Sequence, residues 1–140
     1  MPSNIQTITF HYQLHNDLQS VPSHWHALID SAQQITEQAY APYSRFKVGA
    51  AVLLDNGVIV TGNNQENMAF PSGLCAERVA IFYAGAQYPN QTIKAIAIAV
   101  NPEAFKVNQP LAPCGSCRQA LLEYELKQSE PIEVLLTGQD

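Results

Sequence analysis

Two short segments hold all three cysteines of the sequence, and they constrain the fold more than any other feature. Cys75 lies in Pro71–Arg78, whereas Cys114 and Cys117 lie in Pro113–Arg118. Each segment stands where a run of helical apolar spacing begins, so each predicts a helix start. Two cysteines three positions apart share one side of a first helical turn. The three sulfurs can therefore meet only if the fold brings two helix N-termini together.

A zinc ion suits this ligand set. A catalytic zinc has three protein ligands and keeps a fourth position open for water, and thiolates are among its preferred ligands. Glu77, two residues after Cys75, is placed to handle protons beside the metal rather than to bind it. Two alternatives stay open: buried thiols without metal, or a closed structural zinc with a histidine as fourth ligand, drawn from His11, His15, His24 and His26.

The order Cys-Ala-Glu and then Pro-Cys-Gly-Ser-Cys is similar to the signature of zinc deaminases. With cysteine as the first ligand, the sequence resembles the homotetrameric zinc-dependent cytidine deaminases of nucleoside salvage. The resemblance runs from about residue 32 to about residue 137 and includes Ala41–Ala51 and Gly62–Asn67. It implies an α/β fold, a three-layer α/β/α sandwich with a mixed β-sheet. It also implies a homotetramer, although a homodimer stays open.

The resemblance assigns zinc to the three cysteines and catalysis to Glu77. Zinc lowers the pKa of bound water to about 7. Glu77 is then expected to pass a proton from water to ring nitrogen 3 and later to the departing ammonia, acting as base and then as acid. Arg78 and Arg118 could withdraw charge from the thiolates. If Glu77 is not catalytic, its negative charge could simply stabilise the positive end of the helix dipole in the first helical turn.

The resemblance also suggests how a substrate is held. Asn64 and Glu66 correspond to residues that bind the ribose hydroxyls, although both could instead cap their loop. Phe46 corresponds to an aromatic residue that lines the nucleoside pocket, although a strand phenylalanine is often part of a core. Backbone groups near Ala76 are expected to meet the base.

These assignments imply hydrolytic deamination of cytidine and 2'-deoxycytidine to uridine and 2'-deoxyuridine, with release of ammonia. One alternative is a related zinc deaminase of another amino-heterocycle or of a cytosine-type antibiotic. The pairing of Asn64 with Glu66 favours a plain nucleoside. Another alternative is a non-catalytic, zinc-stabilised deaminase-like protein, against which the intact Glu77 argues.

Charge and length limit the classes of protein to which this chain could belong. The chain of 140 residues is expected to form a single domain, 1–140. A net charge of −5 with seven Lys and Arg disfavours a nucleic-acid partner, which would call for a basic face. No apolar stretch approaches the roughly 20 residues of a membrane span, and the N-terminus does not have a signal-peptide pattern. An odd number of cysteines favours a reducing cytoplasm over a disulfide framework.

The remaining pattern predicts the order of elements. An N-terminal extension, 1–20, contains alternating apolar residues over 5–14, which predict an extra edge strand or an oligomer contact. A helical stripe follows over 25–39, then strands over 46–54 and 58–62 joined by the turn Asp55–Gly57. Helices are expected over 75–86 and 114–127, and strands over 93–100 and 132–136. The family pattern continues beyond the position of Gly138 with a further strand, whereas this sequence ends at Asp140, so a natural short form and a truncated chain both stay open.

Overall fold

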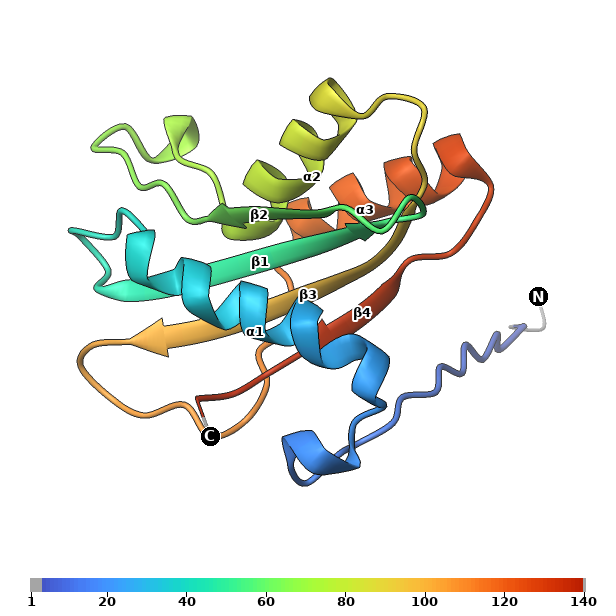
Figure 1. Cartoon of the computed structure of the whole chain (residues 1–140), viewed down its shortest axis with the longest axis horizontal. Helices are drawn as coiled ribbons and strands as arrows, with labels where there is room; N and C mark the ends of the chain where they lie inside the picture. The colour runs from blue at the N-terminus through green and yellow to red at the C-terminus, as the bar shows by residue number, and fades with distance from the viewer. Residues whose placement is uncertain (1–3, 140) are drawn as a thin grey trace.

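A four-stranded mixed sheet forms the middle of the molecule in the computed structural model, which describes residues 4–139. The strands lie in the order β2-β1-β3-β4 (Figure 1). Their bounds are β1 Phe46–Leu54, β2 Ile59–Asn63, β3 Ile93–Pro102 and β4 Glu133–Leu136. β1 pairs antiparallel with both β2 and β3, whereas β3 and β4 run parallel. The mixed sheet expected from the sequence is confirmed.

Three helices cover the two faces of this sheet. They are α1 His26–Ile35, α2 Ala76–Gln87 and α3 Gly115–Gln128. Helix α1 crosses one face, and α2 and α3 lie side by side on the other (Figure 1). Short 3₁₀ turns lie at Leu18–Ser20, Ser23–Trp25, Thr36–Gln38 and Phe70–Ser72. The three-layer α/β/α sandwich implied by the family resemblance is therefore present.

The alternation of β1 divides the core into two halves. Ala50, Val52 and Leu54 face α2 and α3, whereas Ala51 faces α1. Successive strand residues point to opposite faces, so a strand buried on both sides reads as a continuous apolar run. Each large aliphatic side chain buried in this way contributes roughly 1.5–3 kcal/mol. The sheet thus fixes α2 and α3 on the face that carries the cysteines.

Two glycines let the helices approach the sheet closely. A Cβ at Gly49 would lie 2.1 Å from the Ala32 carbonyl oxygen of α1. A Cβ at Gly62 would lie 2.5 Å from the Ala80 nitrogen and 2.8 Å from the Ala76 oxygen of α2. No side chain fits either gap, so both positions require glycine. The contact at Gly62 seats the first turn of α2, and with it Cys75, on β2.

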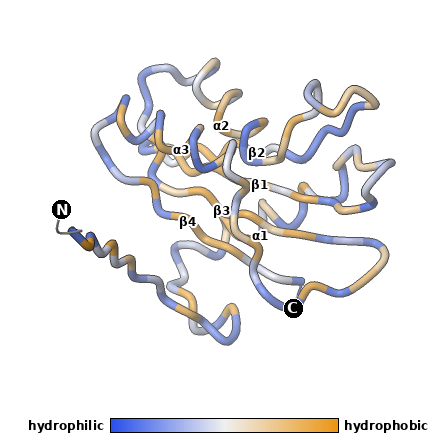
Figure 2. Tube along the Cα trace, turned by 180° about the vertical axis from the view of Figure 1, so that it is seen from behind, coloured by the Kyte–Doolittle hydropathy of each residue, from blue (hydrophilic) through white to orange (hydrophobic). Residues whose placement is uncertain are grey.

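The N-terminal arm, residues 4–15, corrects one expectation. No strand forms there, and its apolar side chains Ile5, Ile8, Phe10, Tyr12 and Leu14 are 73–92% exposed. Figure 2 shows the arm leaving the body of the molecule. Alternation alone does not make a strand, because the backbone N–H and C=O groups also need a neighbouring edge to pair with. Within this chain the arm meets no such edge, and the alternative of an oligomer contact stays a prediction.

The first predicted helix is also shorter than its apolar stripe. Helix α1 ends at Ile35, and a 3₁₀ turn continues to Gln38. The Thr36 hydroxyl donates to the Gln33 carbonyl at 2.7 Å, which draws the last turn tighter. Across residues 4–139, no helix is both long and apolar enough to span a membrane.

Candidate zinc centre and active site

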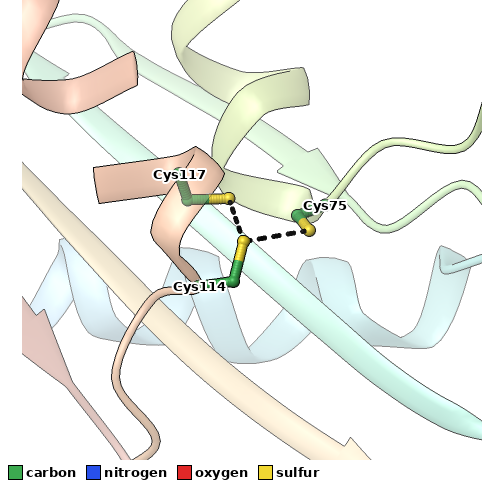
Figure 3. A group of neighbouring side chains, drawn as sticks. All are labelled: Cys75, Cys114 and Cys117. Carbon is green, nitrogen blue, oxygen red and sulfur yellow. Dashed lines mark hydrogen bonds between the residues drawn. The ribbon is translucent and has the colours of Figure 1, made fainter. Parts of the chain in front are cut away.

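Two helix N-termini converge on one point through their N-cap residues. Cys75 is the N-cap of α2 and Cys114 is the N-cap of α3, and both have extended backbones with ψ of 154° and 167°. Neither side chain caps its own helix. Cys117 lies one turn into α3 and is fully buried. The three side chains point toward one another from the two helices (Figure 3).

The spacing of the sulfurs matches a zinc site. The Sγ atoms of Cys75 and Cys114 are 4.0 Å apart, and those of Cys114 and Cys117 are 3.5 Å apart. All three lie within 4.8 Å of one another. Tetrahedral zinc with Zn–S bonds of about 2.3 Å sets its sulfurs about 3.8 Å apart. Among the described residues, this is the one cluster of three or more potential metal ligands, so the histidines of the N-terminal segment gain no support as ligands.

The local charges favour a thiolate at Cys75. Its contact with Cys117 is the largest cause of a pKa lowered to about 5, and Arg78 and Cys114 lower it further against the effect of burial. The same contact, followed by burial, raises the pKa of Cys117. The surroundings therefore favour the negative charge on the Cys75 sulfur and disfavour it on the Cys117 sulfur. Zinc would displace the remaining thiol protons, because only thiolates bind it.

Arg78 is the cation that touches the cluster. Its Nη2 donates to Cys75 Sγ at 3.7 Å, and its Nε is buried without a hydrogen-bond partner. A buried, unpaired donor is costly unless negative charge lies nearby, and three thiolates around zinc would supply that charge. Arg118, the other arginine considered from the sequence, has an exposed side chain, and its bond to Cys114 is from its backbone N–H to the Cys114 carbonyl at 2.9 Å.

Glu77 lies beside the sulfurs in the first turn of α2. It is only 5% exposed, although it carries an ionisable carboxyl group. Burial raises its pKa, and the negative charge of Cys75 adds to the effect. A carboxyl group whose pKa is moved toward neutrality can both accept and donate a proton, as an acid-base catalyst must.

Asn64 and Glu66 organise the segment that leads into β1. Asn64 is buried; its Oδ1 accepts from the Val48 N–H at 2.8 Å, and its Nδ2 donates to the Phe46 carbonyl at 2.9 Å. Glu66 Oε2 accepts from the N–H groups of Tyr43 and Ser44 at 2.9 and 3.2 Å. Within the chain, the side chains of Asn64 and Glu66 thus bond to backbone groups, as the alternative of loop capping predicts. Partial burial raises the pKa of Glu66, but the bonds from Ser44 and Tyr43 outweigh it and lower the pKa.

Phe46 is the first residue of β1 and Ala76 the first residue of α2. Ala76 is the fully buried first residue of α2, so its N–H is among those without an intrahelical partner. Phe46 is half-buried, and its ring contacts that of Phe105, with centroids 6.0 Å apart. The sequence did not predict this contact, because the polar loop around Phe105 shows no periodicity.

A separate hollow lies at the opposite end of α2. It encloses about 180 Å³ and is lined by the C-terminal turns of α2 and α3 and the loop before β3, including Leu54, Gly85, Tyr88, Thr92, Tyr124 and Gln128. None of the cysteines lines it. It holds no cluster of potential metal ligands, so its chemistry gives no reason to move the candidate site away from the sulfurs.

Comparison with known proteins agrees with this geometry. Residues 22–129 match the family model described as "Cytidine and deoxycytidylate deaminase zinc-binding region", which covers most of the chain. The chain belongs to this deaminase family. The matched residues include all three cysteines, Glu77 and the loop with Asn64 and Glu66.

Relatives within the deaminase family are similar in both sequence and fold. A cytidine deaminase of Halalkalibacterium halodurans is 44% identical over 96 residues, which cover 69% of this chain and 68% of the relative. One of Sporosarcina psychrophila is 42% identical over 97 residues, covering 69% and 67%. The crystal structure of cytidine deaminase from Burkholderia pseudomallei superposes with a TM-score of 0.69 at 39% identity, over 86% of this chain and 87% of that one.

Proposed function

We propose that this protein is a zinc-dependent cytidine deaminase, which hydrolyses cytidine and 2'-deoxycytidine to uridine and 2'-deoxyuridine and releases ammonia. One observation carries the proposal: the buried Glu77 lies beside three sulfurs spaced as zinc ligands. A purely structural site would have no use for a buried acid at this place. The names of the relatives, all cytidine deaminases, support the same reaction.

The residues of the chain divide the work between binding and proton transfer. Cys75, Cys114 and Cys117 would hold zinc, which when bound supplies Lewis-acid activation of water. Glu77 accepts the proton of the attacking water and donates it to ring nitrogen 3 of the pyrimidine. As the water oxygen bonds to carbon 4, Glu77 is left ionised; it then takes the second proton from that hydroxyl and gives it to the amino group, so the carbon–nitrogen bond breaks, ammonia leaves and a carbonyl forms. Arg78 offsets the negative charge of the thiolates through Cys75.

Nucleoside recognition is assigned to the loop before the zinc helix. The bonds of Glu66 to Tyr43 and Ser44 use Oε2, which leaves Oε1 to accept from a sugar hydroxyl. Asn64 still has one amide hydrogen and one lone pair beyond its two backbone bonds. Phe46 lines the base, and the N–H groups near Ala76 face it. A carboxylate suits a hydroxyl and repels a phosphate, so a free nucleoside fits better than a nucleotide or a nucleic acid.

The proposal includes the environment and the assembly. Three free thiols and a zinc site suit a reducing cytoplasm. Exposed apolar side chains on α2 and α3 and in the loop before α2 suit a homotetramer, with a homodimer as the smaller alternative; they are Met68, Phe70, Phe82, Tyr83, Leu122 and Leu126. Scattered apolar residues are normal on a surface, whereas several on neighbouring helices indicate a contact.

The test is a direct assay of the purified protein. Loss of cytidine absorbance should be seen with the protein as purified, should stop with a zinc chelator and should return with added zinc. Deoxycytidine should react, free cytosine should react poorly, and single-stranded DNA or RNA should not react. Full activity after complete zinc removal, or preference for an oligonucleotide, would overturn the proposal. A preference for another amino-heterocycle would favour the related-deaminase alternative.

A further inference from the structure

The loop between β3 and α3, residues 103–112, carries an aromatic side chain that the mechanism above does not use. Phe105 is 58% exposed, yet its ring meets that of Phe46 with centroids 6.0 Å apart and planes tilted by 46°. An aromatic pair of this geometry is attractive beyond its buried area. More than half of the Phe105 side chain nevertheless stays available to another partner.

The pair of rings lies near the N-terminal ends of α2 and α3, the ends that carry the cysteines. Phe46 follows the alternation of Val48 and Ala50, so it lies on the sheet face covered by α2 and α3. The first turn of α2 crosses Gly62, whose strand partner is Ala50, whereas Leu54 lines the hollow at the far end of that helix. Leu54, at one end of β1, therefore lies near the C-terminal end of α2, whereas Phe46, at the other end of β1, lies toward the N-terminal end of α2, where Cys75 is.

Two sets of contacts hold the loop on either side of Phe105. On one side, the Glu103 N–H donates to the Arg45 carbonyl at 3.0 Å, and Lys47 pairs with Glu103 at 3.3 Å. On the other side, the Val107 N–H donates to Gln139 Oε1 at 2.8 Å, and the Gln139 N–H donates to the Val107 carbonyl at 2.9 Å. The backbone is therefore held two residues before and two residues after Phe105.

The contact between Val107 and Gln139 is supported by further contacts to neighbouring segments. Gln139 Nε2 also donates to Asn101 Oδ1 at 3.1 Å, which connects this contact to the end of β3. A Cβ at Gly138 would lie 3.1 Å from the Val107 carbonyl oxygen and from the Asn108 carbonyl carbon, so the two segments pack backbone against backbone. The loop is thus held against the segment that follows β4, while its other end runs into Cys114.

We propose that Phe105 is a specificity-determining residue that packs against the flat apolar surface of the bound nucleoside, beside Phe46. This inference rests on the function proposed above and names a second aromatic wall for that site. A pyrimidine presents a π face that stacks on aromatic side chains. Phe46 enters from the start of β1 and Phe105 from the loop that leads to Cys114, so the two rings would contact the nucleoside from two different elements. Gln139 is a positioning residue, because it acts through the loop.

Steady-state kinetics of single variants test the contact. Phe105→Ala should raise KM for cytidine about tenfold, as expected when an aromatic face leaves a base, and should change kcat less than about twofold, because Glu77 and the cysteines are untouched. Phe105→Tyr should restore KM, since it keeps the ring. Gln139→Ala should give a smaller rise. Lys106→Ala is the matched control, one exposed residue along the same loop, and should behave as the parent protein.

A binding measurement separates this inference from the proposed reaction. Trp25 is the only tryptophan in the sequence, so Phe105→Trp combined with Trp25→Phe places a single indole on the loop. Its fluorescence should change on saturable binding of uridine, the product. An unchanged KM in Phe105→Ala, or no emission change where uridine binding is seen by calorimetry, would overturn the role of Phe105 while leaving the deaminase function intact. A parent protein that neither binds uridine nor consumes cytidine would overturn the proposed function, and the role of Phe105 with it.

Discussion

Cys75 and Cys114 stand at N-cap positions, where Ser, Thr, Asp or Asn would usually satisfy the first free N–H groups of a helix. Neither cysteine makes such a bond. Replacing a capping side chain typically costs about 1 kcal/mol, so both helices begin without a stabilisation that other residues would give. In exchange, the two sulfurs reach the same point with Cys117. Zinc would then act at two helix starts at once, which couples metal binding to the packing of α2 against α3.

Removal of one ligand should remove the metal. Cys114→Ala leaves two sulfurs, and a site with only two protein ligands holds zinc weakly. Elemental analysis of the purified variant should show far less than one zinc per chain, with lower solubility as the helix starts loosen. Ser116→Ala, at the exposed position between the two cysteines of α3, is the control and should keep its zinc. A full zinc content in Cys114→Ala would contradict the assigned ligand set.

Glu77 should be needed for turnover but not for metal binding. Glu77→Gln keeps the shape of the side chain but cannot carry a proton, so the rate should fall by about 10² or more. Zinc content should stay near one per chain, because the amide does not disturb the sulfurs. Glu123→Gln, an exposed change on α3, is the matched control. Near-normal turnover with zinc in place would exclude Glu77 from the chemistry.

Glu66 should matter for the sugar more than for the base. Glu66→Ala should lose about 1–3 kcal/mol of cytidine recognition, the usual size of a hydrogen bond to a charged group. Free cytosine has no sugar, so its residual reaction should change much less. Glu66→Gln keeps an oxygen for the N–H groups of Tyr43 and Ser44, which separates loss of loop structure from loss of charge. Equal losses for cytidine and cytosine would show that Glu66 only supports its loop.

At the scale of elements, helix α2 has to lie tight against β2 to place Cys75. Gly62→Ala would put a methyl group against the backbone of Ala76 and Ala80, which cannot rotate away. We expect a loss of about 1–3 kcal/mol in the free energy of unfolding, the usual cost of overpacking, together with weaker zinc binding. Urea unfolding at fixed protein concentration measures the loss. Gly115→Ala is the control, since its added Cβ would meet no other atom within 4 Å, and equal stability of both variants would contradict the tight seat.

Local pattern was enough to predict the elements that pack within the chain. The strand expected over 46–54 has those bounds in the structure, and the zinc helices agree within one residue. Each of these features follows from residues that are close together in the sequence. The apolar run of β1 predicts burial on both of its faces, Asp55–Gly57 predicts a turn, and the spacing of Cys114 and Cys117 places both sulfurs on one side of a helix. The zinc centre could be predicted because its residues lie in two short motifs, one at each helix start.

The sequence did not reveal features that depend on contacts between distant segments. The arm at residues 4–15 alternates like a strand, but alternation says nothing about whether an edge lies within reach. Phe105 and Gln139 meet their partners only because β3, the following loop and the segment after β4 come together in space. The bonds of Asn64 to the backbone of β1 likewise follow from tertiary position, and sequence left them as one alternative among two.

At the scale of the whole molecule, several large apolar side chains on α2, on α3 and in the N-terminal arm are exposed to solvent in the single chain. On helix α2, Phe82 and Tyr83 are 43% and 55% exposed in the single chain. Leu122 and Leu126 of the neighbouring helix α3 are exposed as well, as is the apolar side of the arm. The side chains on α2 and α3 lie in the layer that carries the cysteines, so a contact between subunits there would involve the same two helices as the candidate site.

We therefore predict that the protein assembles into a homotetramer, with a homodimer as the smaller alternative. Light scattering should give about four times the chain mass of 15.4 kDa for the parent protein, with about twice that mass as the smaller alternative. Phe82→Glu should lower the mass, because a buried, unpaired charge at a contact is costly. Gln34→Glu, on the exposed side of α1, is the control and should leave the mass unchanged. Deletion of residues 1–15 tests the arm separately, and should weaken the assembly if the alternating side chains pack on a second copy. A monomeric parent protein with full activity would show that each chain completes its own site and that these apolar surfaces serve no contact between copies.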